Sequence, residues 1–162
     1  MARASGINPN LSAFLDMISV SEGTSTSKYT KDDGYDIVVD GINSPKIFPS
    51  YGSHPNILVT VNSKGLKSTA AGRYQLLNRW WAPYAELLKL NDFSPESQDK
   101  IAIQQIKERG ALDDIKLGNI TAAIKKCSNI WASFPGAGYG QFEHNIQKLL
   151  MVYTEAGGVL RS

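Results

Sequence analysis

The chain has 162 residues and a formal net charge of +2, with 17 Lys and Arg against 15 Asp and Glu. Hydrophobic residues make up 42% and charged residues 20%, which is typical of a globular protein that buries a substantial core. This charge is far below that of dedicated nucleic-acid-binding proteins, and the single cysteine, Cys127, excludes an intrachain disulfide.

No segment approaches the roughly 18 consecutive apolar residues of a membrane span, and the N-terminus lacks the pattern of a secretory signal. We therefore expect no nucleic-acid partner, no stable membrane association and synthesis in the cytosol. Residues 1–10 are expected to form a loose leader, with Asn10 or Ser12 capping the helix that follows.

The segment 11–24 predicts an amphipathic helix that ends near Gly23. Its apolar stripe through Leu11, Leu15 and Ile18 continues, one step of four further on, to Glu22. Partial burial and the negative end of the helix dipole would both raise the pKa of this carboxyl. Glu22 is therefore a candidate general acid near neutral pH, the alternative being a solvated residue of the last turn.

Residues 24–64 predict a small β-lobe inserted between helices. Strands are expected at 35–39 and 57–61, each next to turn residues, whereas the three prolines within 42–56 indicate irregular structure.

The rest of the chain is predicted to be helical. The expected helices cover 68–81, 84–90, 95–109, 119–131 and 142–153, with an interruption near Pro83. Trp80, Trp81 and Trp131 fall at helical positions and are predicted to lie in the core. The Gly-rich segment 134–140 is either a lid over a ligand or a plain connector.

Carboxylates are the most promising catalytic groups. His54 and His144 have no partners at ligand spacing, so no metal site is expected. A helix-end Glu facing a sheet that carries Asp residues is an arrangement that glycoside cleavage can use. The candidates are Asp32, Asp33, Asp36 and Asp40, although Asp residues before Gly commonly serve only the turn. Tyr51 and Tyr139 could stack on sugar rings.

Several blocks of sequence, in the same order, resemble the lambda-type phage endolysins. They include Ala-Phe-Leu-Asp-Met (13–17) with Ser-Glu-Gly-Thr (21–24), Lys-Ser-Thr-Ala-Ala-Gly-Arg-Tyr-Gln-Leu-Leu (67–77), Cys-Ser-Asn-Ile-Trp-Ala-Ser (127–133) and Pro-Gly-Ala-Gly-Tyr-Gly-Gln-Phe-Glu-His (135–144). The resemblance covers nearly the whole chain after residue 12. It is weakest in the first ten residues and in the 42–56 loop.

The resemblance implies a lysozyme-like α+β fold in which residues 1–162 form one catalytic domain, with the cleft between the β-lobe and the helices. It also implies a lytic transglycosylase that acts on peptidoglycan glycan strands without a cofactor. In that chemistry Glu22 first protonates the glycosidic oxygen and then accepts the proton of the muramic 6-hydroxyl, which leaves a 1,6-anhydro ring.

By the same resemblance, Arg73, Tyr74 and Gln75 are expected to face the substrate, unless this segment is simply a helix start packed on the first helix. The loop around Tyr51 and the loop carrying Tyr139 and Gln141 would form two lips over the cleft. The family further implies a monomer that stays in the host cytoplasm until a separate membrane-pore protein, a holin, gives it access to the wall.

Two alternatives remain open at this point. One is a true peptidoglycan hydrolase in which Asp32, Asp33 or Asp36 positions a water. The other is a non-catalytic wall-binding module on the same scaffold.

Overall fold

The structure is a computed structural model that describes residues 1–137 and 143–161. Over these residues it contains α1 (Pro9–Ser21), β1 (Val59–Thr60), β2 (Lys67–Ser68), α2 (Asn78–Leu88), α3 (Pro95–Glu108), α4 (Leu112–Lys116), α5 (Ile120–Cys127) and α6 (Ile146–Glu155). Helices dominate and the sheet is small, so the predicted α+β class is confirmed. None of the helices within the described ranges is long and apolar enough to cross a membrane.

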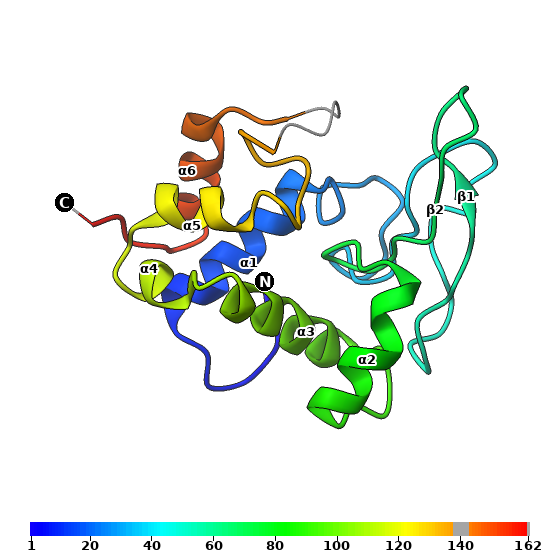
Figure 1. Ribbon diagram of the computed structural model, residues 1–162, viewed down its shortest axis with the longest axis horizontal. Helices are drawn as coiled ribbons and strands as arrows, with labels where there is room; N and C mark the ends of the chain where they lie inside the picture. The colour runs from blue at the N-terminus through cyan, green and yellow to red at the C-terminus, as the bar shows by residue number, and fades with distance from the viewer. Residues whose placement is uncertain (138–142, 162) are drawn as a thin grey trace.

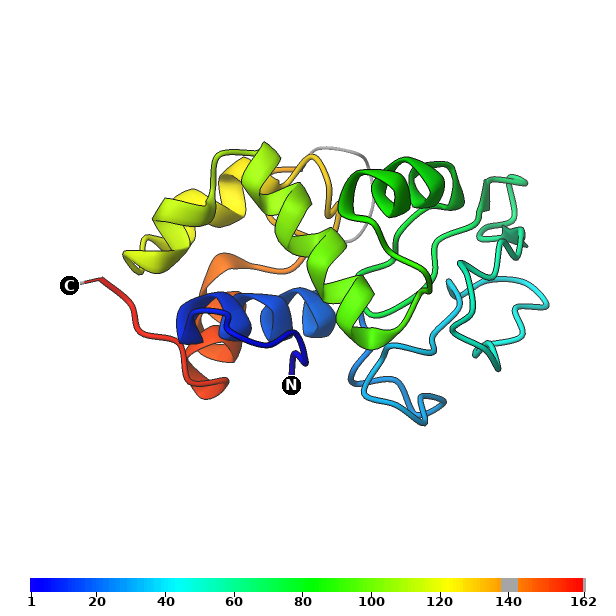
Figure 2. The ribbon, with the colours of Figure 1, turned by 90° about the horizontal axis from the view of Figure 1, so that it is seen from below.

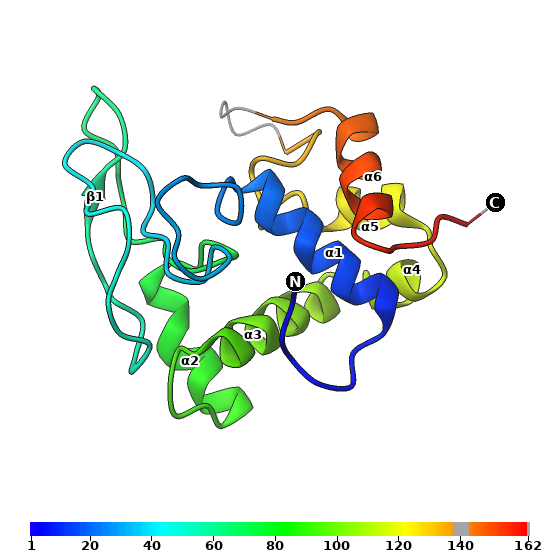
Figure 3. The same ribbon diagram turned by 180° about the vertical axis from the view of Figure 1, so that it is seen from behind.

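The small sheet lies at one end of the molecule, with α2 near it, and α4, α5 and α6 lie at the other end (Figure 1). Seen from below, α1 and α6 form one layer, and α3 rises from it towards a second layer that holds α2, α4 and α5 (Figure 2). From behind, α6 lies directly beside α1 (Figure 3), in agreement with the contacts between these two helices.

The first helix begins earlier than the sequence suggests. Asn8 is its N-cap, because the Asn8 side chain accepts a hydrogen bond from the backbone N–H of Asn10, and Pro9 occupies the first helical position. The expected cap at Asn10 or Ser12 is therefore wrong. The N-terminal residues are also held in place rather than loose, since the Asp99 carboxylate accepts the backbone N–H groups of Arg3 and Ala4.

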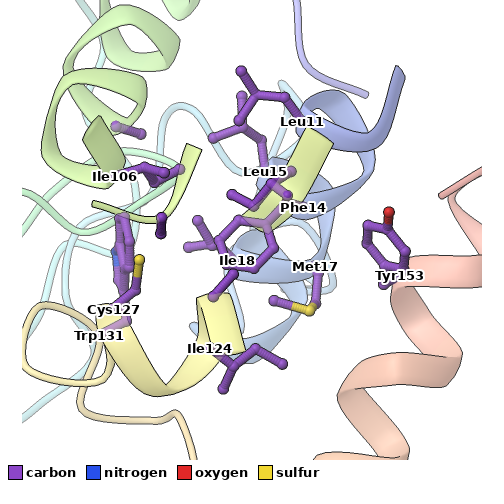
Figure 4. Packing of buried hydrophobic residues seen from close by; sticks show 14 of the residues in the cluster. Leu11, Phe14, Leu15, Met17, Ile18, Ile106, Ile124, Cys127, Trp131 and Tyr153 are labelled. Atoms are coloured by element: carbon purple, nitrogen blue, oxygen red, sulfur yellow. The ribbon is translucent and has the colours of Figure 1, made fainter. Parts of the chain in front are cut away.

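The central helix α1 is buried on almost every side, not along one stripe. Phe14 and Ile18 lie near side chains of α3 and α5, while Met17 lies towards Tyr153 of α6 (Figure 4). A helix enclosed in this way fixes the position of its own C-terminal end. The buried cluster around it includes Leu11, Phe14, Leu15, Met17, Ile18, Ile106, Ile124, Cys127, Trp131 and Tyr153.

The β-lobe contains less regular structure than predicted. The two short strands pair antiparallel with Val59 opposite Ser68, and the predicted strand at 35–39 is reduced to isolated bridges, Ile37 with Ile47 and Val38 with Ala71. A second buried cluster stabilises this lobe in place of an extended ladder. It contains Val38, Phe48, Val59, Ala71, Leu76, Phe93 and Ile101.

Three predictions for residues 68–88 are wrong. Residues 68–77 are not helical, and α2 starts only at Asn78 and runs unbroken through Pro83. Proline is tolerated there because α2 has no buried residue, so water can satisfy the carbonyl that loses its donor. Trp80, predicted in the core, is 46% exposed, whereas Trp131 is buried as predicted.

The helix predicted at 95–109 is confirmed, with Ser94 as N-cap and Pro95 in the first turn. Asn119 precedes α5 as expected, but α5 ends at Cys127, before Trp131. The short helix α4 was not predicted.

Candidate active site

Glu22 stands at the C-terminal end of α1. It is the C-cap residue, and its N–H bonds to the carbonyl of Ile18. Gly23 follows with φ of +75°, and the N–H of Thr24 bonds back to the carbonyl of Ser19. This Schellman-type ending uses glycine's freedom at positive φ to turn the chain sharply away. Glu22 is thereby left at the helix end with its side chain facing a pocket.

Thr24 joins this helix end to the 72–75 segment. Its hydroxyl donates to the carbonyl of Arg73 at 2.6 Å, and Gln75, two residues after Arg73, has a φ of +56°. A non-glycine residue at positive φ is uncommon and strained, and such residues often mark functional sites. Gln75 is further fixed by a hydrogen bond from its Nε2 to the carbonyl of Gly72.

Glu22 and Gln75 line one pocket of about 170 Å³. Its other walls come from the loop after α1 and from the β-lobe, so it lies between the lobes, as expected. The remaining lining residues are Gly23, Ser27, Tyr29, Ile37, Val38, Asp40 and Lys46.

Burial raises the pKa of the Glu22 carboxyl from the ordinary 4.5 to about 7. A hydrogen bond from the Ser133 hydroxyl to Oε2, at 3.1 Å, works in the opposite direction because it stabilises the carboxylate. Ser133 is held by a 2.7 Å hydrogen bond to the hydroxyl of Ser21. Near neutral pH this carboxyl is therefore able both to donate and to accept a proton.

Three of the four Asp residues considered as partners of Glu22 are occupied elsewhere. Asp32 pairs with Arg3 and accepts the Tyr51 hydroxyl. Asp33 pairs with Arg73, and Asp36 accepts from the Thr30 hydroxyl and the Lys31 N–H. None of the three lines the Glu22 pocket formed by the described residues.

Asp40 is the exception among the β-lobe carboxylates, because it does line that pocket. Its side chain is 92% exposed, and Oδ1 lies 2.8 Å from Nζ of Lys46. The lysine hydrogen bond is the main cause of a lowered pKa for Asp40, which therefore stays ionised.

Arg73 and Tyr74 belong to the interior rather than to the pocket wall. The Arg73 guanidinium bonds to the carboxylates of Asp16 and Asp33 at 2.9 and 3.3 Å, and its side chain is 2% exposed. The Tyr74 hydroxyl donates to Asp99 Oδ1 at 2.6 Å. Both side chains face away from the Glu22 pocket and link α1, the β-lobe and α3. Of the predicted motif, only Gln75 shares the pocket with Glu22.

Comparisons with known proteins agree with this geometry. The Endolysin family model matches residues 12–160. The endolysin of Escherichia phage lambda is 56% identical over 96% of both chains, and that of Escherichia phage P2 is 54% identical over 93% of this chain and 94% of its own. The chain belongs to the endolysin family.

A solved structure, bacteriophage lambda lysozyme complexed with a chitohexasaccharide, superposes with a TM-score of 0.90 at 56% identity, covering 96% of this chain and 98% of that one. The fold is therefore lysozyme-like, as the sequence resemblance implied. Endolysins degrade the bacterial cell wall, and this chain is a member of that class of enzymes.

The other predicted site residues of this endolysin lie outside the pocket or outside the described residues. Tyr51 is half-buried and directs its hydroxyl to Asp32. Tyr139 and Gln141 lie outside the described ranges. His54 is a buried structural residue whose Nδ1 accepts from the N–H of Asn56, so Nε2 donates to the carbonyl of Leu76. Within the described ranges, no group of three His, Cys, Asp or Glu side chains could hold a metal ion.

Three residues near Glu22 were missed by the sequence analysis. Tyr29 and Lys46 line the pocket from irregular segments that have no periodicity, and Ser133 reaches Glu22 from a residue 111 positions away. Only a three-dimensional structure brings such residues together.

Proposed function

We propose that this endolysin is a peptidoglycan lytic transglycosylase. The neutral Glu22 carboxyl gives its proton to the oxygen between N-acetylmuramic acid and N-acetylglucosamine, and the bond from that oxygen to the muramic anomeric carbon breaks. The muramic 6-hydroxyl oxygen then bonds to the same carbon, and its proton passes to the Glu22 carboxylate. Glu22 ends as it began, water is not consumed, and the product carries a 1,6-anhydro ring.

The observation that carries this proposal is a single half-buried carboxyl with a pKa of about 7 at the pocket. One group that acts first as acid and then as base needs a pKa close to the working pH. The occupation of Asp32, Asp33 and Asp36 by structural partners also supports a mechanism without a second carboxylate.

We assign substrate binding to Gln75 together with Tyr29, which line the pocket beside Glu22. Arg73 and Tyr74 support the site from the interior. Tyr51, Tyr139 and Gln141 remain proposed contacts on the family resemblance. The chitohexasaccharide in the lambda lysozyme complex supports a glycan chain as the ligand of this cleft.

The cellular setting is proposed on the same basis. One catalytic domain would span residues 1–162, act as a monomer without a cofactor, and remain in the host cytoplasm until a holin opens the membrane.

A hydrolase is the second candidate, and the position of Asp40 in the pocket favours it. An ionised, exposed carboxylate across from a protonated Glu22 could activate a water, as in inverting glycosidases. The wall products of the two mechanisms differ in mass by one water molecule.

The test is mass spectrometry of the fragments released from purified peptidoglycan by the wild type, Glu22→Gln and Asp40→Asn. Anhydromuramic ends from the wild type and Asp40→Asn, with no products from Glu22→Gln, are expected. Reducing muramic ends that disappear in Asp40→Asn would establish the hydrolase instead. Binding to the wall without cleavage by any of the three proteins would identify a non-catalytic module.

A further inference from the structure

A second hollow of about 380 Å³ lies beside the candidate active site, between α2, the end of α3 and residues 129–131. Gln75 lines this groove as well as the Glu22 pocket, so the two hollows meet at that residue. Figures 1 and 2 show α2 and α3 side by side on the helical part of the molecule. A ligand held at Glu22 could therefore extend from the pocket into this groove.

The groove carries two exposed guanidinium groups, Arg79 and Arg109. Neither forms an ion pair with a carboxylate of the described residues. The acidic residue of the groove, Glu108, is already engaged, because its carboxylate accepts hydrogen bonds from Tyr84 and Gln104. Two guanidinium groups against this one carboxylate leave the groove with a net positive charge that a ligand carboxylate can meet.

Both guanidinium groups are held in place before any ligand arrives. The Arg79 guanidinium lies over the indole ring of Trp80, 5.3 Å from its centroid, and Trp80 itself is 46% exposed. Nη1 of Arg109 lies 2.8 Å from the side-chain amide of Asn129, and the hydrogen-bonding surroundings of that amide assign its oxygen to the side that faces the guanidinium. Preorganised arginines bind carboxylates at a lower entropic cost than free side chains do.

The chemistry of the substrate indicates which part of it would enter. The sugar rings of peptidoglycan are uncharged, and the lactyl carboxyl of the muramic residue is consumed in the amide bond to its peptide. The free carboxylates belong to that stem peptide. Arginine matches carboxylates with paired hydrogen bonds, so charge complementarity favours the peptide over further sugars.

We propose that the groove lined by Arg79, Trp80 and Arg109 binds the stem peptide of the glycan strand through its carboxylates. The groove would make this endolysin prefer peptide-bearing strands over bare ones. The inference rests on the proposed action on peptidoglycan, but it holds for either the transglycosylase or the hydrolase chemistry.

The experiment compares two substrates: uncrosslinked glycan strands with their tetrapeptides, and the same strands after an amidase has removed the peptides and the freed lactyl carboxyls have been converted to uncharged methylamides. The double variant Arg79→Gln/Arg109→Gln should lose about tenfold in kcat/KM on the peptide-bearing strands and less than about twofold on the bare strands. The double variant Lys116→Gln/Lys148→Gln removes the same charge at exposed positions outside the groove and should match the wild type on both.

Binding is measured separately in a Glu22→Gln background, by calorimetric titration with a disaccharide-tetrapeptide and with the peptide-free disaccharide whose lactyl carboxyl is blocked as an uncharged methylamide. The groove variant should weaken only the first. An equal loss on both ligands would mean that the groove binds sugars, and no loss on either would mean that it binds no part of the substrate; both results overturn the inference. A wild type that binds the peptide ligand normally but cleaves nothing would refute the proposed function alone.

Discussion

Replacing Glu22 with Gln tests the burial of the carboxyl without any assay of catalysis. Glutamine has nearly the shape of a protonated glutamate but never carries charge. The pKa of Glu22 is raised in the folded protein, so between about 4.5 and 7 the folded state binds more protons than the unfolded state. The contribution of the protonated Glu22 carboxyl to the free energy of unfolding is therefore fully present below pH 4.5 and is lost as the pH rises through 7.

The size of the effect follows from the pKa. A rise from 4.5 to about 7 corresponds to at most about 3 kcal/mol of folding free energy above pH 7. The carboxyl is partly exposed to water at the pocket, which screens its charge, so we expect about 2 kcal/mol. In a chain of this length, that corresponds to a rise in Tm of about 4 to 8 °C for Glu22→Gln at pH 8.

Thermal and urea unfolding of the wild type and Glu22→Gln at pH 4, 6 and 8 measure this directly. The difference between the two proteins should be near zero at pH 4, grow with pH and level off above pH 7. Because only the difference is used, all other titrating groups cancel. A stability difference that does not change with pH would show that Glu22 has an ordinary pKa. It would refute the role of Glu22 as a general acid near neutral pH.

Three further variants probe the neighbours of Glu22. Ser133→Ala removes a donor to the carboxylate, so the alkaline limb of the kcat/KM profile should move up by about one pH unit, with Ser133→Thr restoring it. Arg73→Ala breaks a buried ion-pair network and should lower the free energy of unfolding by about 3 kcal/mol in urea; a loss below 1 kcal/mol would contradict this. Gln75→Gly relieves backbone strain at positive φ but loses a side-chain hydrogen bond, and each effect is worth about 1 kcal/mol, so Tm should barely change. The same variant should lower kcat/KM more than tenfold, because it lacks the side chain that lines the pocket. Unchanged activity would show that Gln75 does not bind substrate.

The position of Glu22 was predictable because local rules agree there. Apolar spacing identified α1, and Gly23 marked its end, so the carboxyl was expected at the end of the buried helix. The start of α3 was predictable for the same reason, since Ser94 and Pro95 form a cap and first turn that need no tertiary partner.

The segment 68–77 was mispredicted because tertiary contacts determine its structure. Gly72 has a φ of +85°, and a Cβ there would lie 2.4 Å from Oε1 of Gln98, so the chain passes too close to α3 for any other residue. That same Oε1 accepts the N–H of Arg73, while Nε2 of Gln98 donates to the carbonyls of Tyr35 and Phe93. The bond to Arg73, the paired bonds between Ala71 and Leu76 and the bond from the Gly72 N–H to the carbonyl of Ile37 thus take the place of a helical ladder. No local sequence pattern reveals these contacts.

The same contacts explain why neighbours in one motif serve different purposes. Gln98 and Thr24 hold the backbone of Arg73 from α3 and from the end of α1, and the left-handed turn at Gln75 then reverses the direction of the chain. As a result the Arg73 and Tyr74 side chains point into the interior, where they connect to Asp16 and Asp99, and the next side chain enters the pocket. Loss of the Arg73 ion pairs would therefore displace Gln75 relative to Glu22, so Arg73→Ala should impair catalysis even where the protein remains folded.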